Sequence, residues 1–346
     1  MTAQVFKDFL HSARTTAKWH RMRHLLTPQD KLLILLHGEP DPDSMAAGWA
    51  FQHLVRPRVH SVRLVATQPV KREQNVRFLR TLKVPIEFVD AVPWDSFTKI
   101  ALVDAQPHFF HSPPPVPFDI VIDHHPRRQA SPLRCADIRP NYGSTATILL
   151  EYLLVAGVPL PRKLATALWF ALRTDTDNLT RLVHTADLAA YSFLYRKSDR
   201  SMVQWLEQSD IPAAYREFYI RGLYLLDPAR GRDVIYLGDI PQPDVCVHIA
   251  DFLARFMGVR WLAVAGIARE MLYVIFRSGS YSVNVGSIAR RKLEPFGSAG
   301  GHRDKARAEI PATTLAKILN LPLTDVRVEQ WLRSVLLGTP RTRAHA

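Results

Sequence analysis

The sequence predicts an α/β protein: an N-terminal domain with a mostly parallel sheet flanked by helices, a helical connector, and a smaller C-terminal α/β domain. The chain has 346 residues, and at roughly 150 residues per domain this suggests about two domains. Strand-length apolar runs alternate with helical patterns in the first half, and a second strand-rich region follows a long helical stretch. We expect a basic helical extension at 1–29, the first α/β domain at 30–186, the helical connector at 187–228, the second α/β domain at 229–325, and a C-terminal helix and tail at 326–346.

The first half reads as a series of βαβ units. Its strands are expected at 31–37, 60–66, 98–105 and 118–125, and its helices at 44–55, 73–82, 145–157 and 161–176. The proline-rich stretch between the last two strands must be a loop, because proline cannot donate to a central ladder. Consecutive parallel strands joined by helices place their carboxyl ends along one edge of a sheet.

The second half begins with a continuously helical pattern over 187–226. Strands are then expected at 233–240, 261–269, 271–279 and 281–289, with a helix at 244–257. Residues 296–310 (FGSAGGHRDKARAEI) are small and basic, and we expect a glycine-rich loop there.

Charge and cysteine content narrow the function classes. The chain carries 45 Lys and Arg against 32 Asp and Glu, a formal charge of +13. This surplus favours nucleic acid, nucleotides or phosphorylated substrates as partners, although a solvated basic surface is the alternative. Two cysteines exclude a disulfide framework and fit a reducing compartment. We expect a cytoplasmic protein with no membrane span.

The N-terminal residues form a basic amphipathic pattern without the apolar core of a secretion signal. We expect a helix in which Phe6 and Phe9 pack against the body while Lys18 and Arg21 face water. The alternative is a helix that contacts nucleic acid or a membrane surface.

Acidic and imidazole side chains follow the predicted strands of the first domain. They come from four separate segments: His37, Asp41 and Asp43 after the first strand, Asp104 after the third, Asp123, His124 and His125 after the fourth, and Asp175 at the end of a helix. So many like charges at one edge repel each other unless cations neutralise them. Carboxylates and imidazoles without thiolates favour Mn²⁺ or Mg²⁺. A pair of such ions sharing one carboxylate could activate a hydroxide for attack on phosphorus.

Simpler interpretations exist for single members of this set. Asp43 could cap the helix expected from Ser44, and Asp104 could be an ordinary turn residue. The sequence Asp-His-His directly after an apolar strand is much less common, and the set in this order makes the metal site the preferred hypothesis.

These motifs resemble the DHH family of phosphoesterases, with residues 277–278 and 300–302 resembling its DHHA1 type of C-terminal domain. The resemblance implies that 30–186 is the DHH catalytic domain. It implies that His37 and Asp41 bind one metal ion, that Asp43, His124 and Asp175 bind a second, and that Asp104 bridges both. It also implies that His125 contacts the substrate phosphate or orients a ligand. Asp123 is counted with His125 and Asp104 in the catalytic group, with a structural role in which it hydrogen-bonds nearby backbone.

In the second domain, the resemblance implies that Arg277, Ser278, Gly300, Gly301 and His302 bind substrate. Arginine can grip a phosphate through two hydrogen bonds, and small residues let the backbone approach it. The family pattern has three adjacent glycines, whereas Ala299 replaces the first of them here.

The leading hypothesis is a hydrolase that uses two divalent ions, Mn²⁺ or Mg²⁺, on short RNA or DNA oligonucleotides or on small nucleotides such as pAp and dinucleotides. The family includes oligoribonucleases and RecJ exonucleases. The alternatives are a cyclic-dinucleotide phosphodiesterase and a non-catalytic nucleotide-binding protein. The sequence leaves the natural substrate, the metal and a homodimer open.

Overall fold

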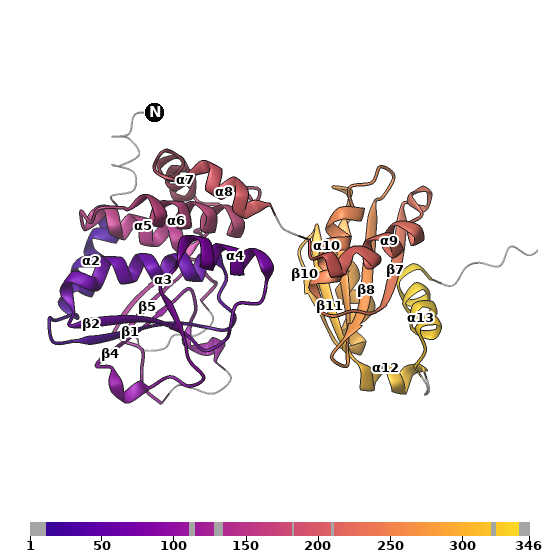
Figure 1. Ribbon diagram of the computed structural model, residues 1–346, viewed down its shortest axis with the longest axis horizontal. Helices are drawn as coiled ribbons and strands as arrows, with labels where there is room; N and C mark the ends of the chain where they lie inside the picture. Colours follow the sequence, from indigo (N-terminus) through magenta and orange to yellow (C-terminus); the bar gives the residue numbers. More distant parts are fainter. Residues whose placement is uncertain are drawn as a thin grey trace, which may run out of the picture. The chain divides into compact units, whose positions relative to one another are not determined.

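The computed structural model describes residues 12–110, 115–127, 134–181, 183–208, 211–319 and 323–338. The chain divides into two compact units, Met1–Asp210 and Ile211–Ala346 (Figure 1). The first holds a six-stranded parallel sheet with helices, and the second holds a smaller five-stranded sheet with helices. The α/β class predicted from the sequence is therefore confirmed. In the described part of the chain, no helix has the length and apolar character to cross a membrane.

The sheet of unit 1 has the strand order β3-β2-β1-β4-β5-β6, and every pair of neighbours is parallel. Its strands are β1 (Lys31–Leu36), β2 (Ser61–Ala66), β3 (Ile86–Phe88), β4 (Lys99–Val103), β5 (Ile120–Asp123) and β6 (Cys135–Ile138). The chain runs from β1 outward to β3 and then returns to β4 on the other side of β1. Open α/β sheets bind ligands at the carboxyl ends of the strands where the order reverses, which here are β1 and β4.

The helices of unit 1 cover one face of this sheet (Figure 1). They are α2 (Ala13–His24), α3 (Pro42–Val55), α4 (Glu73–Leu82), α5 (Thr145–Val155), α6 (Arg162–Asp175), α7 (Thr185–Lys197) and α8 (Arg200–Glu207). Strand β1 shows the period of two: Leu32, Ile34 and Leu36 pack on the helical side, while Leu33 and Leu35 pack under connecting loops. The strand is buried on both faces, which explains its continuous apolar sequence.

Strands β3 and β6 were not predicted, because three or four residues carry too short an alternation to be recognised. Edge strand β6 is covered by α2, whose Lys18 donates from Nζ to the Ala136 carbonyl at 2.5 Å. The expectation that Lys18 faces water is therefore wrong. The helix is held by buried Trp19 and Met22. Residues 6 and 9, expected to pack, lie outside the described residues.

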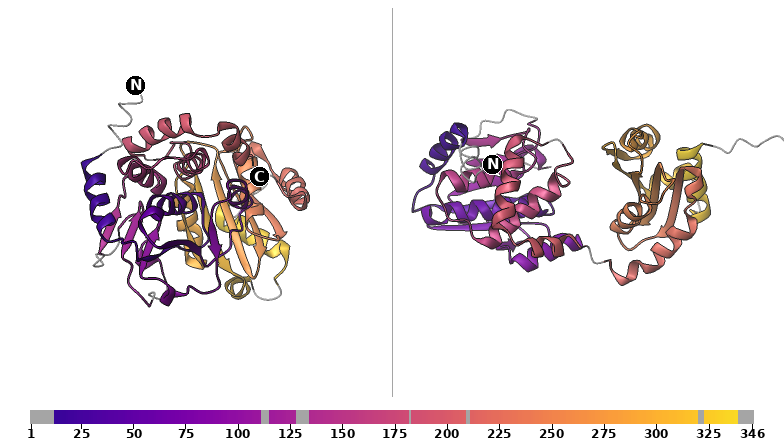
Figure 2. Two further views of the ribbon diagram at one scale, coloured as in Figure 1. Left: turned by 60° about the vertical axis from the view of Figure 1, so that its left-hand side comes forward. Right: turned by 90° about the horizontal axis from the view of Figure 1, so that it is seen from above.

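The sheet of unit 2 has the order β10-β11-β9-β8-β7, with β7 and β8 parallel and the other neighbours antiparallel. Its strands are β7 (Arg232–Asp239), β8 (Trp261–Ala268), β9 (Met271–Ser278), β10 (Ser298–Gly301) and β11 (Lys305–Pro311). Its helices are α9 (Arg216–Leu225), α10 (Asp244–Leu253), α11 (Val285–Leu293), α12 (Ala312–Leu319) and α13 (Asp325–Leu337). Helices pack on both faces of this sheet (Figure 2).

Two sequence expectations for unit 2 are wrong. Residues 281–289 were expected to be a strand, but α11 begins at Val285 because the side chain of Asn284 accepts a hydrogen bond from Ser287 N–H at 3.0 Å. The expected glycine-rich loop is largely a hairpin of β10 and β11. The connector expected at 187–228 supplies α7 and α8 to unit 1 and α9 to unit 2.

Candidate metal centre

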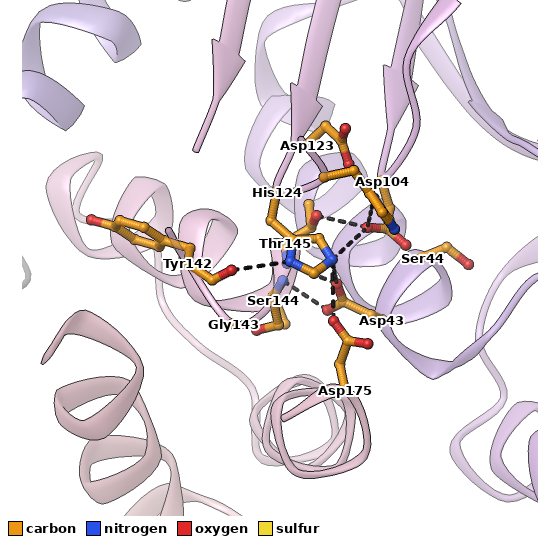
Figure 3. A network of polar contacts seen from close by, with 12 residues as sticks. Asp43, Ser44, Asp104, Asp123, His124, Tyr142, Gly143, Ser144, Thr145 and Asp175 are labelled. Carbon is orange, nitrogen blue, oxygen red and sulfur yellow. Dashed lines mark hydrogen bonds and ion pairs between the residues drawn. The ribbon is translucent and has the colours of Figure 1, made fainter. Parts of the chain in front are cut away.

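The acidic and imidazole side chains of unit 1 meet at the carboxyl ends of β4 and β5, beside the ends of three helices (Figure 3). Asp104 directly follows β4, and His124 directly follows Asp123 at the end of β5. Asp43 lies in the first turn of α3, and Asp175 is the last residue of α6. Segments that are far apart in the sequence therefore contribute to one place.

The start of α3 separates the two carboxylates of the first motif. Asp41 is the N-cap: its Oδ1 accepts from Ser44 N–H at 2.9 Å, and Ser44 Oγ accepts from Asp41 N–H at 3.0 Å. The alternative that Asp43 caps this helix is wrong. Asp43 is buried and accepts hydrogen bonds from the N–H groups of Thr145 at 2.7 Å and Ala146 at 2.9 Å. The positive end of α5 therefore holds the Asp43 carboxylate.

Asp104 has an uncommon backbone conformation, with φ at 60°. Its N–H still continues the ladder by donating to Ile122 O at 2.9 Å, and its Oδ1 accepts from Thr145 Oγ1 at 2.8 Å. Left-handed non-glycine residues cost about 1 kcal/mol or more and are concentrated at functional sites. The same helix start thus orders Asp43 through its backbone and Asp104 through a side chain.

His124 is the centre of the arrangement (Figure 3). Its Nδ1 lies 3.1 Å from the carbonyl oxygen of Tyr142, which can only accept, so Nδ1 carries the proton. In the neutral ring, Nε2 then presents a lone pair toward three carboxylates. It lies 3.1 Å from Asp175 Oδ2, 3.7 Å from Asp104 Oδ1 and 4.0 Å from Asp43 Oδ2. A lone pair facing carboxylate oxygens is repulsive unless a cation or a proton lies between them.

The pKa values of the carboxylates also indicate that a positive charge is needed beside them. Burial raises the pKa of Asp43 and Asp104 well above the usual range, and neighbouring carboxylates raise both further. Burial also raises the pKa of Asp175, whose Oδ2 is buried without a hydrogen-bond partner among the described residues. The charged forms of all three groups need a positive partner that the protein itself does not supply in sufficient amount.

The donor atoms are close enough to share an ion. In the described part of the chain, two groups have ligand atoms that all lie within 4.8 Å of one another: Asp43, His124 and Asp175, and Asp104, His124 and His125. Carboxylate and imidazole donors without thiolates suit Mn²⁺ or Mg²⁺. The residues present therefore fit a divalent cation.

Asp123 supports the site from behind. It is fully buried and accepts hydrogen bonds from His125 Nδ1 at 2.8 Å and from Gln106 Nε2 at 2.6 Å. Burial alone would raise the pKa of Asp123, but the hydrogen bond and charge of His125 outweigh it and lower the pKa. The same hydrogen bond raises the pKa of His125. Gln106 was missed by the sequence reasoning, because a single loop glutamine carries no periodic or motif signal.

His37 and Asp41 are in neither of the two ligand groups. The His37 ring packs edge-on against Phe110 and Phe109, at centroid distances of 4.5 Å and 5.9 Å. Phe109 also contacts His125 at 5.5 Å. These two phenylalanines, from a short turn after β4, form an aromatic wall beside the histidines that the sequence reasoning did not identify.

A pocket of 570 Å³ opens beside Asp43 and Asp175. Its walls come from the starts of α3 and α4, from the end of α6 and the chain after it, and from the end of α8. After α6 the backbone makes a left-handed turn over three consecutive non-glycine residues, 177–179, with φ between 49° and 66°. Arg181 closes this turn by donating from Nη1 to the Asp175 carbonyl at 2.9 Å.

The predicted substrate residues of unit 2 lie on β9 and β10 or directly after β10. Arg277 is held by a carboxylate that the sequence reasoning missed: its Nε lies 2.5 Å from Asp251 Oδ1 and its Nη2 lies 3.4 Å from Asp251 Oδ2. Ser278 donates to the Ser280 carbonyl at 2.7 Å.

The glycine positions serve the hairpin of unit 2. Gly301 has φ at 144°, and a Cβ there would lie 2.5 Å from Ala306 Cα. A Cβ at Gly300 would meet no atom within 4 Å. The exposed His302 follows β10, and its carbonyl accepts from Gly286 N–H at 2.9 Å at the start of α11.

Comparison with known proteins adds the fold relationship. No family model matches the chain. An uncharacterized protein of Methanocaldococcus jannaschii is 28% identical over 308 residues, or 88% of this chain, and the chain spans 63% of that relative's length. An exopolyphosphatase-related protein from Bacteroides fragilis superposes with a TM-score of 0.66 at 15% identity, covering 96% of each chain. This likeness shows a shared fold.

Two further solved structures are more distant. A protein assigned as a family II inorganic pyrophosphatase, from Methanococcus jannaschii, has a TM-score of 0.39 at 14% identity over 86% of this chain and 99% of its own. The pGpG-specific phosphodiesterase of Vibrio cholerae has a TM-score of 0.38 at 11% identity over 88% and 99%.

Proposed function

We propose that this protein is a metal-dependent phosphoesterase that hydrolyses short oligonucleotides or small nucleotides such as pAp and dinucleotides. The observation that carries the proposal is the orientation of His124, whose Nε2 lies between 3.1 Å and 4.0 Å from carboxylate oxygens of Asp175, Asp104 and Asp43. A divalent cation satisfies all four groups at once. The names of the structural neighbours support hydrolysis at phosphorus.

The proposed ligands follow the sequence motifs. Asp43, His124 and Asp175 hold one ion, His37 and Asp41 hold the other, and Asp104 is shared. The closeness of the first three donors supports that half of the assignment. Mn²⁺ is the proposed ion, with Mg²⁺ as the other candidate, because oxygen and imidazole donors suit both.

Divalent ions in such a site lower the pKa of a bound water and stabilise negative charge that develops on phosphate oxygens. The chain's own residues prepare this chemistry. Tyr142 O fixes the His124 tautomer, and Thr145 orients both Asp43 and Asp104. The hydrogen bond to Asp123 raises the pKa of His125, and in its protonated form His125 would donate from Nε2 to a non-bridging phosphate oxygen.

Unit 2 supplies the proposed grip on the end of the substrate. Arg277 and His302 would bind a terminal phosphate, and Gly300 would admit it close to the backbone, since nothing occupies the space above its Cα. Asp251 keeps the guanidinium of Arg277 in a defined orientation. A phosphate would then meet an arginine whose side-chain entropy is already reduced.

The test is a hydrolysis assay with Mn²⁺ on labelled dinucleotide, pAp, cyclic dinucleotide and longer RNA. Asp104→Asn and His124→Ala should lower kcat/KM by about 10³-fold, roughly 4 kcal/mol, and should lower the bound Mn²⁺ measured by elemental analysis. Asp95→Asn, an exposed carboxylate outside the site, is the matched control and should keep both. Absence of Mn²⁺-dependent hydrolysis of every substrate by the unmodified protein contradicts the proposal.

A further inference from the structure

A second pocket of unit 1, with a volume of 620 Å³, lies away from the carboxylates. Its walls come from the second half of α3, the turn after α3, the start of β2 and the chain between α4 and β3. The pocket is therefore at the amino ends of strands, whereas the candidate metal centre is at carboxyl ends. Asp43 lies in the first turn of α3 and Arg56 directly follows that helix, which separates the two places by about 20 Å.

The lining of this second pocket is positively charged. The turn after α3 supplies Arg56 and His60, the end of α4 supplies Lys83, and no Asp or Glu is among the lining residues. Arg56 and Lys83 are exposed, and neither has an ion pair or a side-chain hydrogen bond within the ranges that the structure describes. Arg63 of β2, in contrast, is paired with Glu87 at 2.8 Å. The charge of the pocket is therefore available to an anion.

Trp49 gives the same pocket an aromatic wall. Its half-buried indole packs against the core of unit 1 and also lines the pocket. Among the described residues, no ring or guanidinium stacks on it. Trp19 and Trp205 each have an arginine guanidinium over the ring, at 5.1 Å and 4.9 Å. An open indole beside unpaired cations suits a ligand that combines a flat aromatic ring with negative charge.

The walls of the pocket are held in place by the fold. His53 donates from Nε2 to the Pro159 carbonyl at 2.9 Å, which fixes its ring. Helix α3 lies so close to the sheet at Gly48 that a Cβ there would be 2.7 Å from Leu64 Cδ1. The next residue, Trp49, is therefore presented by a helix with a fixed position. A preformed wall lowers the entropy lost when a ligand binds.

Lys83 occupies an unusual position for a lysine. It follows the last residue of α4 with φ at 55° and ψ at 50°, a left-handed conformation in which helices usually end on glycine. A side chain with a Cβ costs free energy in this conformation. Lysine at this position therefore lowers the stability of the helix end and adds a positive charge to the pocket.

We propose that this pocket binds a nucleoside polyphosphate, with the base against Trp49 and the phosphate chain against Arg56, His60 and Lys83. A volume of 620 Å³ lies within the usual range of small-molecule sites, about 300–1,000 Å³. The site binds its nucleotide without a metal ion and without hydrolysis, because no carboxylate lines it. It goes beyond the proposed function, which concerns the other edge of the sheet.

Binding in the absence of metal tests this site. The unmodified protein in EDTA is titrated by calorimetry with ATP, with adenosine, which lacks phosphate, and with inorganic tripolyphosphate, which lacks a base. ATP should bind at least about tenfold more tightly than either partial ligand. Tripolyphosphate that binds as tightly as ATP would reveal a basic surface and overturn the proposal. A short single-stranded DNA that binds more tightly than ATP would also overturn it.

Variants of the two walls should have different effects on the partial ligands. Trp49→Leu keeps an apolar side chain but removes the flat ring, and circular dichroism checks its fold. It should weaken ATP binding about tenfold, or about 1.4 kcal/mol, and change tripolyphosphate binding less than about twofold. Arg56→Gln should weaken both about tenfold. Lys197→Gln, an exposed lysine of α7 outside the pocket, is the matched control. Unchanged ATP binding by Trp49→Leu and Arg56→Gln contradicts the site.

Lys83→Gly separates binding from folding. It should raise the Tm, because glycine suits the left-handed position, and should weaken ATP binding about tenfold. A lysine with only a structural role would not give opposite changes in stability and binding. Unchanged ATP binding by this variant removes the phosphate contact and contradicts the proposal.

Two further variants exclude binding elsewhere. Asp104→Asn and Arg277→Ala should leave ATP binding in EDTA unchanged. Loss of binding in either one, with Arg56→Gln unaffected, would assign the nucleotide to the metal centre or to unit 2 and overturn the site. If ATP binds as described but the protein with Mn²⁺ hydrolyses nothing, this site stands and the proposed function fails.

Discussion

The two units handle charge in opposite ways. In unit 1, Asp43, Asp104 and Asp175 converge with raised pKa values and without enough positive charge nearby. In unit 2, Arg277 lies against Asp251, so its charge is already balanced. The difference indicates that the carboxylates of unit 1 need an added cation, whereas Arg277 of unit 2 is held in place by the carboxylate of Asp251.

Removal of the metal should have the largest consequence. Chelation should abolish hydrolysis, and adding Mn²⁺ should restore it. Mn²⁺ at 100 times its dissociation constant should also stabilise the protein by about 2.7 kcal/mol, seen as a higher Tm by calorimetry. Asp104→Asn should lose this shift and Asp95→Asn should keep it. An equal Mn²⁺ shift in all three proteins would mean that the ion binds elsewhere.

A buried ion pair in unit 1, Asp137 with Arg139, is a carboxylate whose charge the protein itself balances. It can be compared with the carboxylates of the candidate metal centre. Asp137 accepts from buried Arg139 at 2.6 Å and from Tyr152 at 2.9 Å. Asp137→Asn leaves Arg139 without its full counter-charge, and we expect a loss of about 3 kcal/mol, measured by urea unfolding at neutral pH. No Mn²⁺ should rescue this variant, since the missing charge is one that the protein itself supplies.

The same pair predicts a pH dependence. Burial acts to raise the pKa of Asp137, but hydrogen bonds and charge from Arg139 outweigh it and lower the pKa in the folded protein. The stability from this carboxylate is therefore present above its unfolded pKa, about 3.9, and is lost as the pH falls through the lower folded value. Asp137→Asn should flatten the acid limb of stability against pH; an unchanged acid limb would contradict the assignment.

The two glycines at the end of β10 allow two requirements in unit 2 to be tested separately: a backbone conformation that favours glycine, and open space that a substrate could occupy. Gly301→Ala places a Cβ against Ala306 in a left-handed conformation, and we expect a loss of about 2 kcal/mol in urea unfolding. Gly300→Ala meets no neighbour and should change stability by less than about 0.5 kcal/mol. A raised KM in Gly300→Ala alone would show that the backbone there is approached by substrate.

A weaker effect is expected at Arg277, whose charge is balanced by Asp251. Arg277→Ala should raise KM for pAp about tenfold with unchanged bound metal. Asp251→Asn should raise KM about threefold, because the Arg277 guanidinium then loses its fixed orientation but keeps its charge. Arg255→Ala, an exposed arginine of unit 2, is the control. A lower KM in Asp251→Asn would show instead that Asp251 competes with phosphate for Arg277.

Sequence reasoning was most successful where a property repeats along the chain. Apolar runs of regular length predicted β1, β4 and β5, and chain order then predicted that Asp104 and His124 lie at one edge. It failed for α11, where alternating valines suggested a strand although Asn284 carries a helix-capping signal. Gln106 and Asp251 were missed because their hydrogen bonds join residues at irregular spacings, which leave no periodic trace.

Which residues end the strands of the first sheet could be predicted from the chain alone, because hydrophobic periodicity and chain order are local properties. How those residues meet depends on the packing of distant segments. The tautomer of His124 depends on a carbonyl 18 positions away, and Asp43 is held by N–H groups 102 and 103 positions away. Such contacts depend on how helices and strands pack, and packing brings together residues whose spacing along the chain carries no signal.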